Sequence, residues 1–182
     1  MESTTPSPRR LTDADIRAFL ARLGERYNRR ATLYLVGGSA LILLGSPRPT
    51  VDLDYVGSDL PAQMNDLQKT IQQVADEMKI QIEALPFQEF IPLPQDAERR
   101  HIEVGQFGKL TVCVFDPYSI ALSKIERGFE SDLEDVVFLI RQKRIAYDRL
   151  IELAQTMIAR ATEFNLDVQQ IRAHLNALAQ IK

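Results

Sequence analysis

The residues best suited to chemistry are two aspartates, Asp52 and Asp54, which are separated by one residue in an apolar segment. If this segment is a strand, both side chains point to the same face, and their Cα atoms lie roughly 6.6 Å apart. Two carboxylates on one face repel each other, and a hard divalent cation relieves that repulsion. The spacing therefore predicts that Asp52 and Asp54 hold Mg²⁺ (or Mn²⁺).

A glycine-rich turn, Gly37-Gly38-Ser39, precedes this pair. It follows an apolar stretch at residues 33–36, which predicts a buried strand, and comes before a short apolar helix over residues 40–44. Glycines allow a tight turn, and the first N–H groups of a helix can bind an anion. The other phosphate-binding motifs, G-x-x-x-x-G-K-[ST] and G-x-G-x-x-G, do not occur. A phosphate-binding turn beside a metal site is what a protein needs to bind a nucleoside triphosphate and act on it.

The order of these motifs resembles the nucleotidyltransferase superfamily related to DNA polymerase beta. The sequence is most similar to small bacterial nucleotidyltransferase-like proteins and to the nucleotidyltransferase toxins of type IV toxin–antitoxin systems. The matching residues are Gly37, Gly38, Ser39, Arg48, Thr50, Asp52 and Asp54. The resemblance implies that an NTP is bound, with the Gly-Gly-Ser residues at the β- and γ-phosphates, Arg48 at the pocket mouth and Thr50 also at the nucleotide.

A two-metal site for phosphoryl transfer favours a third carboxylate, and the resemblance implies one on a neighbouring strand. Glu83, in Ile-Glu-Ala, and Glu103, in Ile-Glu-Val, both lie among apolar residues of predicted strands. The strand order is not readable from the sequence, and we favour Glu83 only slightly. If neither carboxylate reaches Asp52 and Asp54, a one-metal mechanism or the absence of catalysis is expected.

A second group of charged residues lies in the segment DPYSIALSKIERGFESDLEDVVFLI, residues 116–140. Lys124 and Arg127 are one turn apart on one predicted helix, and Asp132 and Asp135 are one turn apart on the next. A segment of this type returns to the active site in the nucleotidyltransferase toxins. The resemblance implies that Lys124 contacts a nucleotide phosphate, that Arg127 also binds the nucleotide, and that Asp135 or Asp132 orients the lysine or the acceptor. Exposed salt bridges between adjacent helices are the alternative.

The remaining pattern predicts an α/β (α+β) protein with a mixed sheet flanked by helices and a C-terminal helical bundle. A helix with Ile16, Phe19, Leu20, Leu23 and Tyr27 on one face starts near Thr12 or Asp13, and another starts at Pro61. Further elements are a strand at 80–85, an extended segment at 86–94, a hairpin of strands near 101–104 and 109–115, and helices at 117–125, 131–143, 146–161 and 167–181. We expect a disordered tail over 1–10, a nucleotidyltransferase-like core over 11–116, and a helical part over 117–182 packed on that core.

Composition sets the broad class of protein. The chain has 182 residues, of which 45% are hydrophobic and 26% charged, enough to bury one core. A single cysteine fits a reducing compartment, and no apolar run approaches the roughly 20 residues of a membrane helix, so we expect a cytoplasmic protein without membrane attachment. The net charge of -3 argues against a surface for long nucleic acid, although basic residue pairs leave room for a small RNA.

These observations lead to one function and two alternatives. The leading hypothesis is a Mg²⁺-dependent nucleotidyltransferase whose acceptor is a hydroxyl on a protein, a tRNA end or a small molecule, in a toxin-like role. One alternative is a module of the same fold that binds a nucleotide without turnover. The other is an interaction protein whose amphipathic terminal helices dock on another chain, such as an antitoxin or a second copy.

Overall fold

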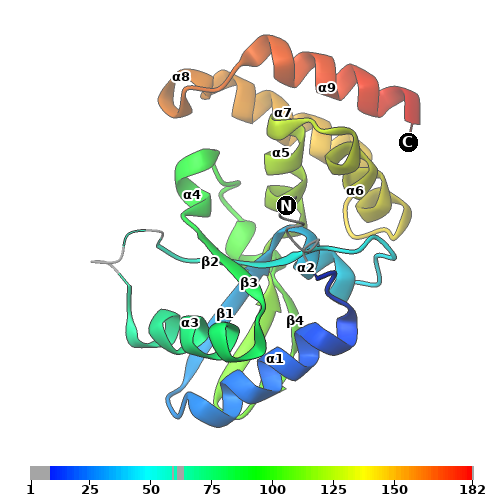
Figure 1. Ribbon diagram of the computed structural model, residues 1–182. Helices are drawn as coiled ribbons and strands as arrows, with labels where there is room; N and C mark the ends of the chain where they lie inside the picture. The colour runs from blue at the N-terminus through cyan, green and yellow to red at the C-terminus, as the bar shows by residue number, and fades with distance from the viewer. Residues whose placement is uncertain (1–8, 59, 61–63, 182) are drawn as a thin grey trace, which may run out of the picture. The chain divides into compact units, whose positions relative to one another are not determined.

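The structure is a computed structural model that describes residues 9–58, 60 and 64–181 (Figure 1). The chain forms two compact units, each built from segments that are not contiguous in sequence. The first unit comprises Met1–Leu85 and Val104–Val112, and the second comprises Pro86–Glu103 and Cys113–Lys182. The expected boundary at residue 116, between the nucleotidyltransferase-like core and the helical C-terminal part, remains a prediction. The disordered tail was predicted for residues 1–10, of which 1–8 lie outside the described residues.

A mixed five-stranded sheet is present in the described part of the chain, as predicted. Its strands are β1 (Ala31–Val36), β2 (Asp52–Val56), β3 (Gln81–Leu85), β4 (Ile102–Phe107) and β5 (Leu110–Val114), in the order β3-β2-β1-β5-β4. β1 pairs with β2 in antiparallel fashion, whereas β2 pairs with β3 in parallel. The two-residue connection between β4 and β5 can join only antiparallel neighbours, which confirms the predicted hairpin.

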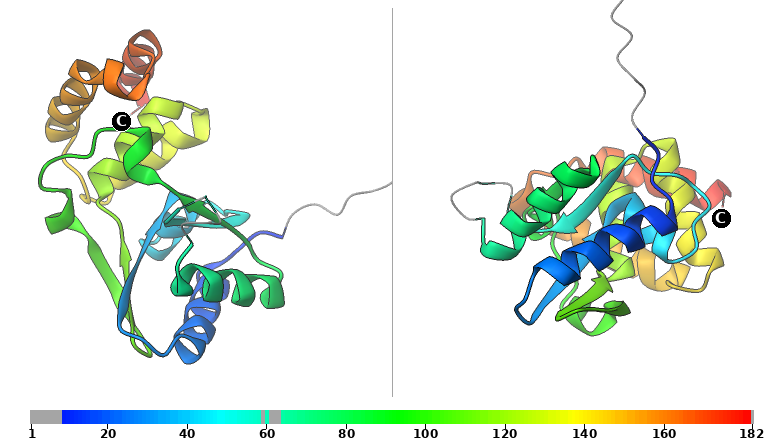
Figure 2. Two further views of the ribbon diagram at one scale, coloured as in Figure 1. Left: turned by 90° about the vertical axis from the view of Figure 1, so that its left-hand side faces the viewer. Right: turned by 60° about the horizontal axis from the view of Figure 1, so that its bottom comes forward.

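Two helices of the first unit, α1 (Asp13–Arg26) and α3 (Asp66–Met78), lie side by side against one face of the sheet (Figures 1 and 2). Thr12 caps α1 in a reciprocal capping box with Asp15. The predicted apolar stripe of α1 is buried at Ile16, Phe19, Leu20 and Leu23. Tyr27, which was predicted on the same face, is instead the half-buried residue after the end of the helix. On β2, Leu53 and Tyr55 are buried, and Gln68 of α3 bonds to the Tyr55 side chain. Strand alternation therefore turns Asp52 and Asp54 to the opposite face of the sheet.

The helix that follows β1 begins earlier than the sequence predicted. α2 (Gly37–Leu43) starts at Gly37, so the Gly-Gly-Ser residues form its first turn instead of a separate turn before it. The second predicted start, at Pro61, lies outside the described residues. In the structure α3 starts at Asp66, where the side chain of Asn65 accepts a hydrogen bond from the Gln68 backbone N–H.

The second unit is helical, as predicted for the C-terminal part. Helices α6 (Glu130–Arg141), α7 (Tyr147–Ala159) and α9 (Val168–Ile181) pack around α5 (Pro117–Arg127), with the short α8 (Ala161–Phe164) after α7. The buried side chain of Asp116 caps α5 by accepting the backbone N–H groups of Tyr118 and Ser119. It also accepts two guanidinium hydrogen bonds from Arg100, at 2.7 and 2.8 Å. These hydrogen bonds raise the pKa of Arg100 above its ordinary value, although its partial burial opposes this.

The extended conformation predicted for residues 86–94 is wrong for residues 87–90. α4 (Phe87–Phe90) forms there, followed by the 3₁₀ helix η2 (Ala97–Arg100). Phe87 is buried and its ring meets the edge of the Phe115 ring at a centroid distance of 5.4 Å, so a tertiary contact folds this proline-punctuated segment. None of the helices in the described part of the chain has both the length and the apolar character that a membrane crossing needs.

Candidate functional site

Three carboxylates meet on the face of the sheet opposite α1 and α3. Asp52 and Asp54 lie two residues apart on β2, and the parallel register sets Glu83 of β3 beside Asp54. The ligand oxygens of these three side chains all lie within 4.8 Å of one another. Among the described residues, Glu103, on β4, is not part of this acidic group. The register thus brings together the aspartate pair and Glu83, the glutamate that the sequence slightly favoured.

Gly37 makes room for one of these carboxylates. β1 and β2 pair Val36 with Asp54, so the residue after Val36 lies against the Asp54 side chain. A Cβ atom at Gly37 would stand 1.8 Å from Oδ2 of Asp54, and Gly37 also adopts a positive φ of +62°. Both the space and the backbone conformation therefore require glycine at this position.

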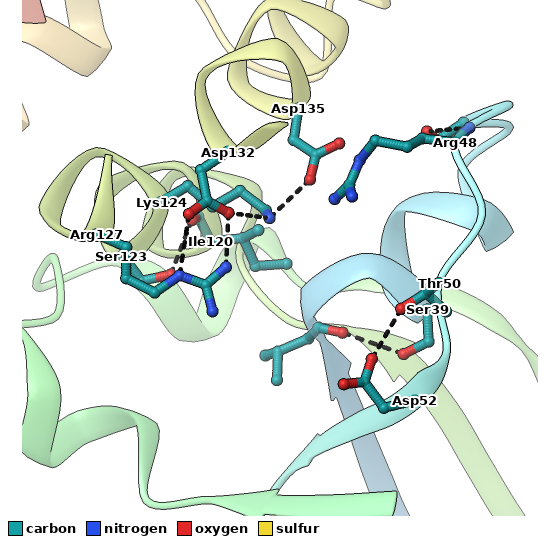
Figure 3. A network of polar contacts seen from close by, with 12 residues as sticks. Ser39, Arg48, Thr50, Asp52, Ile120, Ser123, Lys124, Arg127, Asp132 and Asp135 are labelled. Atoms are coloured by element: carbon teal, nitrogen blue, oxygen red, sulfur yellow. Dashed lines mark hydrogen bonds and ion pairs between the residues drawn. The ribbon is translucent and has the colours of Figure 1, made fainter. Parts of the chain in front are cut away.

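Ser39 and Thr50 also position the acidic residues. The buried Ser39 hydroxyl donates to the carbonyl of Val36 at 3.2 Å and accepts the backbone N–H of Asp54 at 3.3 Å. The Thr50 hydroxyl donates to Oδ1 of Asp52 at 2.8 Å, as Figure 3 shows. Gly38 lies against Thr50, since a Cβ atom there would stand 2.8 Å from the Thr50 hydroxyl. The Gly-Gly-Ser and Thr residues thus hold the two aspartates in place, and their phosphate contacts stay a prediction.

Sequence reasoning missed this positioning role. A threonine two residues before an aspartate is a short-range hydrogen-bonding pattern, and that spacing was the signal in the sequence. Arg48 lies half-buried in the loop between α2 and β2, where its backbone N–H donates to the Ser46 hydroxyl at 3.3 Å. The predicted place of Arg48 at a pocket mouth stays a prediction.

The acidic group fits a small hard cation. At metal–oxygen distances of about 2.1 Å, two ligands on opposite sides of Mg²⁺ stand about 4.2 Å apart, close to the observed spread of the oxygens. Carboxylate oxygen is the donor that Mg²⁺ and Mn²⁺ prefer. Asp52 and Asp54 are half-buried and held by the contacts above, whereas Glu83 is exposed. Because one oxygen of each carboxylate lies within 4.8 Å of the others, the three side chains are close enough to bind one ion together.

The four charged residues predicted from the second segment come together within the second unit. Nζ of Lys124, on α5, lies 3.1 Å from Oδ1 of Asp132 and 2.7 Å from Oδ2 of Asp135, both on α6 (Figure 3). Arg127 donates from Nε and Nη2 to both oxygens of Asp132 at 3.1 and 2.6 Å. The Lys124 side chain is 2% exposed, whereas that of Arg127 is 56% exposed.

This cluster balances buried charge. Burial alone would raise the pKa of Asp132, but the hydrogen bonds from Arg127 and the charge of Lys124 hold that pKa below its ordinary value. Two buried aspartates face one buried ammonium and one half-exposed guanidinium, so the salt bridges are not the exposed pairs of the alternative interpretation. The cluster ties α5 to α6, and the predicted contact of Lys124 with a phosphate remains untested.

A comparison with protein families shows the family to which this chain belongs. Residues 11–178 match the family described as "Nucleotidyltransferase of unknown function (DUF6036)". The chain belongs to this nucleotidyltransferase family. The match spans α1 through most of α9 and includes both the acidic group and the Lys124 cluster. Neither the comparison with curated proteins nor the comparison with solved structures produced a match. The sequence resemblance to the superfamily is thereby confirmed, whereas the closeness to toxins stays a prediction.

Proposed function

We propose that this member of the nucleotidyltransferase family transfers a nucleotidyl group from an NTP to a hydroxyl acceptor, with Mg²⁺ or Mn²⁺ as cofactor. The observation that carries the proposal is the group of three carboxylates, Asp52, Asp54 and Glu83, whose oxygens lie within metal-ligand reach of one another. The family supplies the reaction class, and the carboxylates supply the site that such a reaction needs.

The reaction forms a bond between the acceptor oxygen and the α-phosphorus, and the bond from that phosphorus to the β-phosphate oxygen breaks. Pyrophosphate leaves with the bonding electrons, and the proton of the acceptor hydroxyl passes to a carboxylate or to water. Mg²⁺ bound by Asp52 and Asp54 would supply positive charge to the phosphate oxygens. Glu83, which is exposed, would orient the acceptor hydroxyl and receive its proton.

The residues around the acidic group hold it in one geometry. Thr50 fixes an oxygen of Asp52, Ser39 fixes the backbone of Asp54, and Gly37 leaves space for the Asp54 carboxylate. Such preorganisation matters because a misplacement of about 1 Å can lower a rate about a hundredfold. Phosphate binding by the first turn of α2 and by Arg48, and nucleotide contacts of Lys124, Arg127 and Asp135, rest on the resemblance of the sequence.

The expected acceptor, partner and cellular location also rest on the sequence alone. The acceptor is a hydroxyl of a protein, a tRNA end or a small molecule, and a toxin–antitoxin pair would add an antitoxin as partner. A cytoplasmic location is the expectation from the cysteine content. The alternative of a nucleotide-binding module without turnover loses support, because its premise was the loss of a third carboxylate and Glu83 lies beside Asp54.

The test is incorporation of label from each of the four α-³²P ribonucleotides, with Mg²⁺ or Mn²⁺ and with total RNA or protein extract as acceptor. We expect a labelled macromolecule whose formation falls at least about a hundredfold in Asp52→Asn, Asp54→Asn and Glu83→Gln. Glu103→Gln is the matched control, since it changes the other candidate glutamate, and it should keep full activity. Labelling that survives Asp52→Asn and Asp54→Asn would refute the assignment of the site.

A further inference from the structure

A polar pocket of about 650 Å³ lies at the end of the sheet where β1 begins and where β4 turns back into β5. Its charged lining residues are Arg30 and Lys109, and Thr32 and Thr111 add hydroxyl groups. The backbone N–H of Ala31 donates to the carbonyl of Lys109 at 3.4 Å, and Figures 1 and 2 show the two segments side by side. All of these residues belong to the first unit, which also contains the acidic group.

This pocket carries positive charge that no acidic side chain balances. None of the described residues that line it is acidic. Nζ of Lys109 donates to the carbonyl of Asn28 at 3.3 Å, and within the described part of the chain neither Lys109 nor Arg30 pairs with a carboxylate. The adjacent Arg29, by contrast, pairs with Asp66 at 2.7 Å. An arginine and a lysine beside hydroxyl groups are the side chains that proteins place at phosphate oxygens.

Strand pairing puts the basic pocket and the acidic group on the same face of the sheet. β1 and β2 pair Val36 directly with Asp54, so these two side chains share a face. Side chains two residues apart on a strand also share a face, which adds Tyr34 and Thr32 of β1. The chain from Val36 back to Thr32 spans about 13 Å, and it spans about 20 Å as far as Arg30. The pocket therefore lies about 13–20 Å along the strand direction from the acidic group.

We propose that this face binds the 3′ end of a single-stranded nucleic acid as acceptor, with backbone phosphates at Arg30 and Lys109 and the terminal hydroxyl at the acidic group. The role as acceptor rests on the proposed transfer reaction, in which the 3′ oxygen would form the bond to the α-phosphorus. Stacked nucleotides repeat every 3.4 Å or so along a strand, so the separation corresponds to about four to six nucleotides. Tyr34, half-buried between the two ends, adds an aromatic ring for base stacking. An acidic peptide would use the cations but not the ring, so the combination favours a nucleic acid.

The test is binding of a fluorescein-labelled oligouridylate octanucleotide to the full chain, followed by anisotropy at several salt concentrations without NTP or metal. We expect Arg30→Gln/Lys109→Gln to weaken binding about tenfold or more at about 0.1 M salt. The slope of log affinity against log salt should become shallower by about 1.4, since each lost phosphate contact removes about 0.7. Arg30→Lys/Lys109→Arg keeps both charges and should retain most of the affinity.

Arg17→Gln/Lys69→Gln is the matched control. It also removes one arginine and one lysine, both exposed, but from α1 and α3, which cover the other face of the sheet. This variant should keep the wild-type affinity and salt slope. In the labelling assay, Arg30→Gln/Lys109→Gln should raise KM for the octanucleotide as acceptor and leave KM for a dinucleotide unchanged, because a dinucleotide is too short to reach the pocket from the acidic group.

Three results would overturn the proposal: no binding of the octanucleotide by the wild type, a loss of affinity in Arg30→Gln/Lys109→Gln no larger than in the control, or octaglutamate bound equally tightly through the same two residues. The last result would assign the face to an acidic peptide. The binding measurement contains neither NTP nor metal, so its failure is distinct from that of the transfer reaction. Binding that depends on the pocket, without incorporation of label, would refute the transfer reaction and leave a nucleic-acid-binding face. Incorporation of label without such binding would refute only this assignment of the acceptor.

Discussion

Replacement of Gly37 by alanine should damage the proposed metal site much more than the fold. Gly37 has a φ of +62°, and an alanine Cβ would stand 1.8 Å from Oδ2 of Asp54. The carboxylate must therefore retreat by about 1.6 Å to reach ordinary contact at 3.4 Å. The left-handed backbone conformation adds a penalty of about 1–2 kcal/mol for a residue with a side chain. For a chain of this size that penalty corresponds to a fall in Tm of roughly 2–8 °C.

The displaced carboxylate is the larger effect. Changes in the residues that orient metal ligands lower metal affinity by about ten- to a hundredfold, and Gly37→Ala moves the carboxylate of Asp54, a proposed ligand. We therefore expect the Mn²⁺ dissociation constant to rise at least about tenfold. The assay is a Mn²⁺ titration in which electron paramagnetic resonance reports free Mn²⁺, with Mg²⁺ as competitor. Thermal denaturation of the same preparation supplies the Tm.

Gly45→Ala separates backbone strain from ligand displacement. Gly45 also has a positive φ, of +96°, but a Cβ atom there would meet nothing within 4 Å. This variant should lose Tm to a similar extent and keep the wild-type affinity for Mn²⁺. The reasoning fails if Gly37→Ala binds Mn²⁺ as tightly as the wild type, or if Gly45→Ala weakens binding equally.

Two further predictions concern the buried ion cluster. Lys124→Met leaves Asp132 and Asp135 without their shared ammonium, so urea denaturation should show a loss of about 3–5 kcal/mol in unfolding free energy. Wild-type stability with lost activity would instead indicate a phosphate ligand. Because the pKa of Asp132 is lower in the folded chain than its ordinary 3.8, its stabilisation is complete above that value and is lost as pH falls through the folded pKa. The stability difference between wild type and Asp132→Asn should therefore shrink below about pH 4, and a constant difference would contradict this account.

Local pattern was sufficient for the elements and for part of the site. The spacing of Asp52 and Asp54 placed both on one face of β2, because strand alternation is a property of the backbone alone. The apolar stripe of α1 and a cap at Thr12 or Asp13 were readable for the same reason, since side-chain direction and capping depend on a few neighbouring residues, and the structure has the cap at Thr12. The predicted helices 117–125, 131–143 and 167–181 likewise agree with α5, α6 and α9 to within two residues.

Contacts between distant segments were decided only by the tertiary structure. Glu83 and Glu103 have similar apolar neighbours in sequence, and only the parallel pairing of β2 with β3 places Glu83 beside Asp54. The helix at Phe87–Phe90 was missed because burial of Phe87 against Phe115, 28 residues later, overrides the local pattern of prolines.

The roles of Gly37 and Lys124 also depended on how the chain packs. Gly37 could be read from sequence as a turn residue, but the need for glycine comes from the carboxylate of Asp54, which a strand pairing brings against it. Lys124 could be read as a phosphate ligand or as half of a surface pair, and the fold buries it between Asp132 and Asp135. Sequence therefore determined which side chains share a face, since backbone geometry is local. The tertiary structure decided which faces meet, because strand pairing and charge burial join residues far apart in the chain.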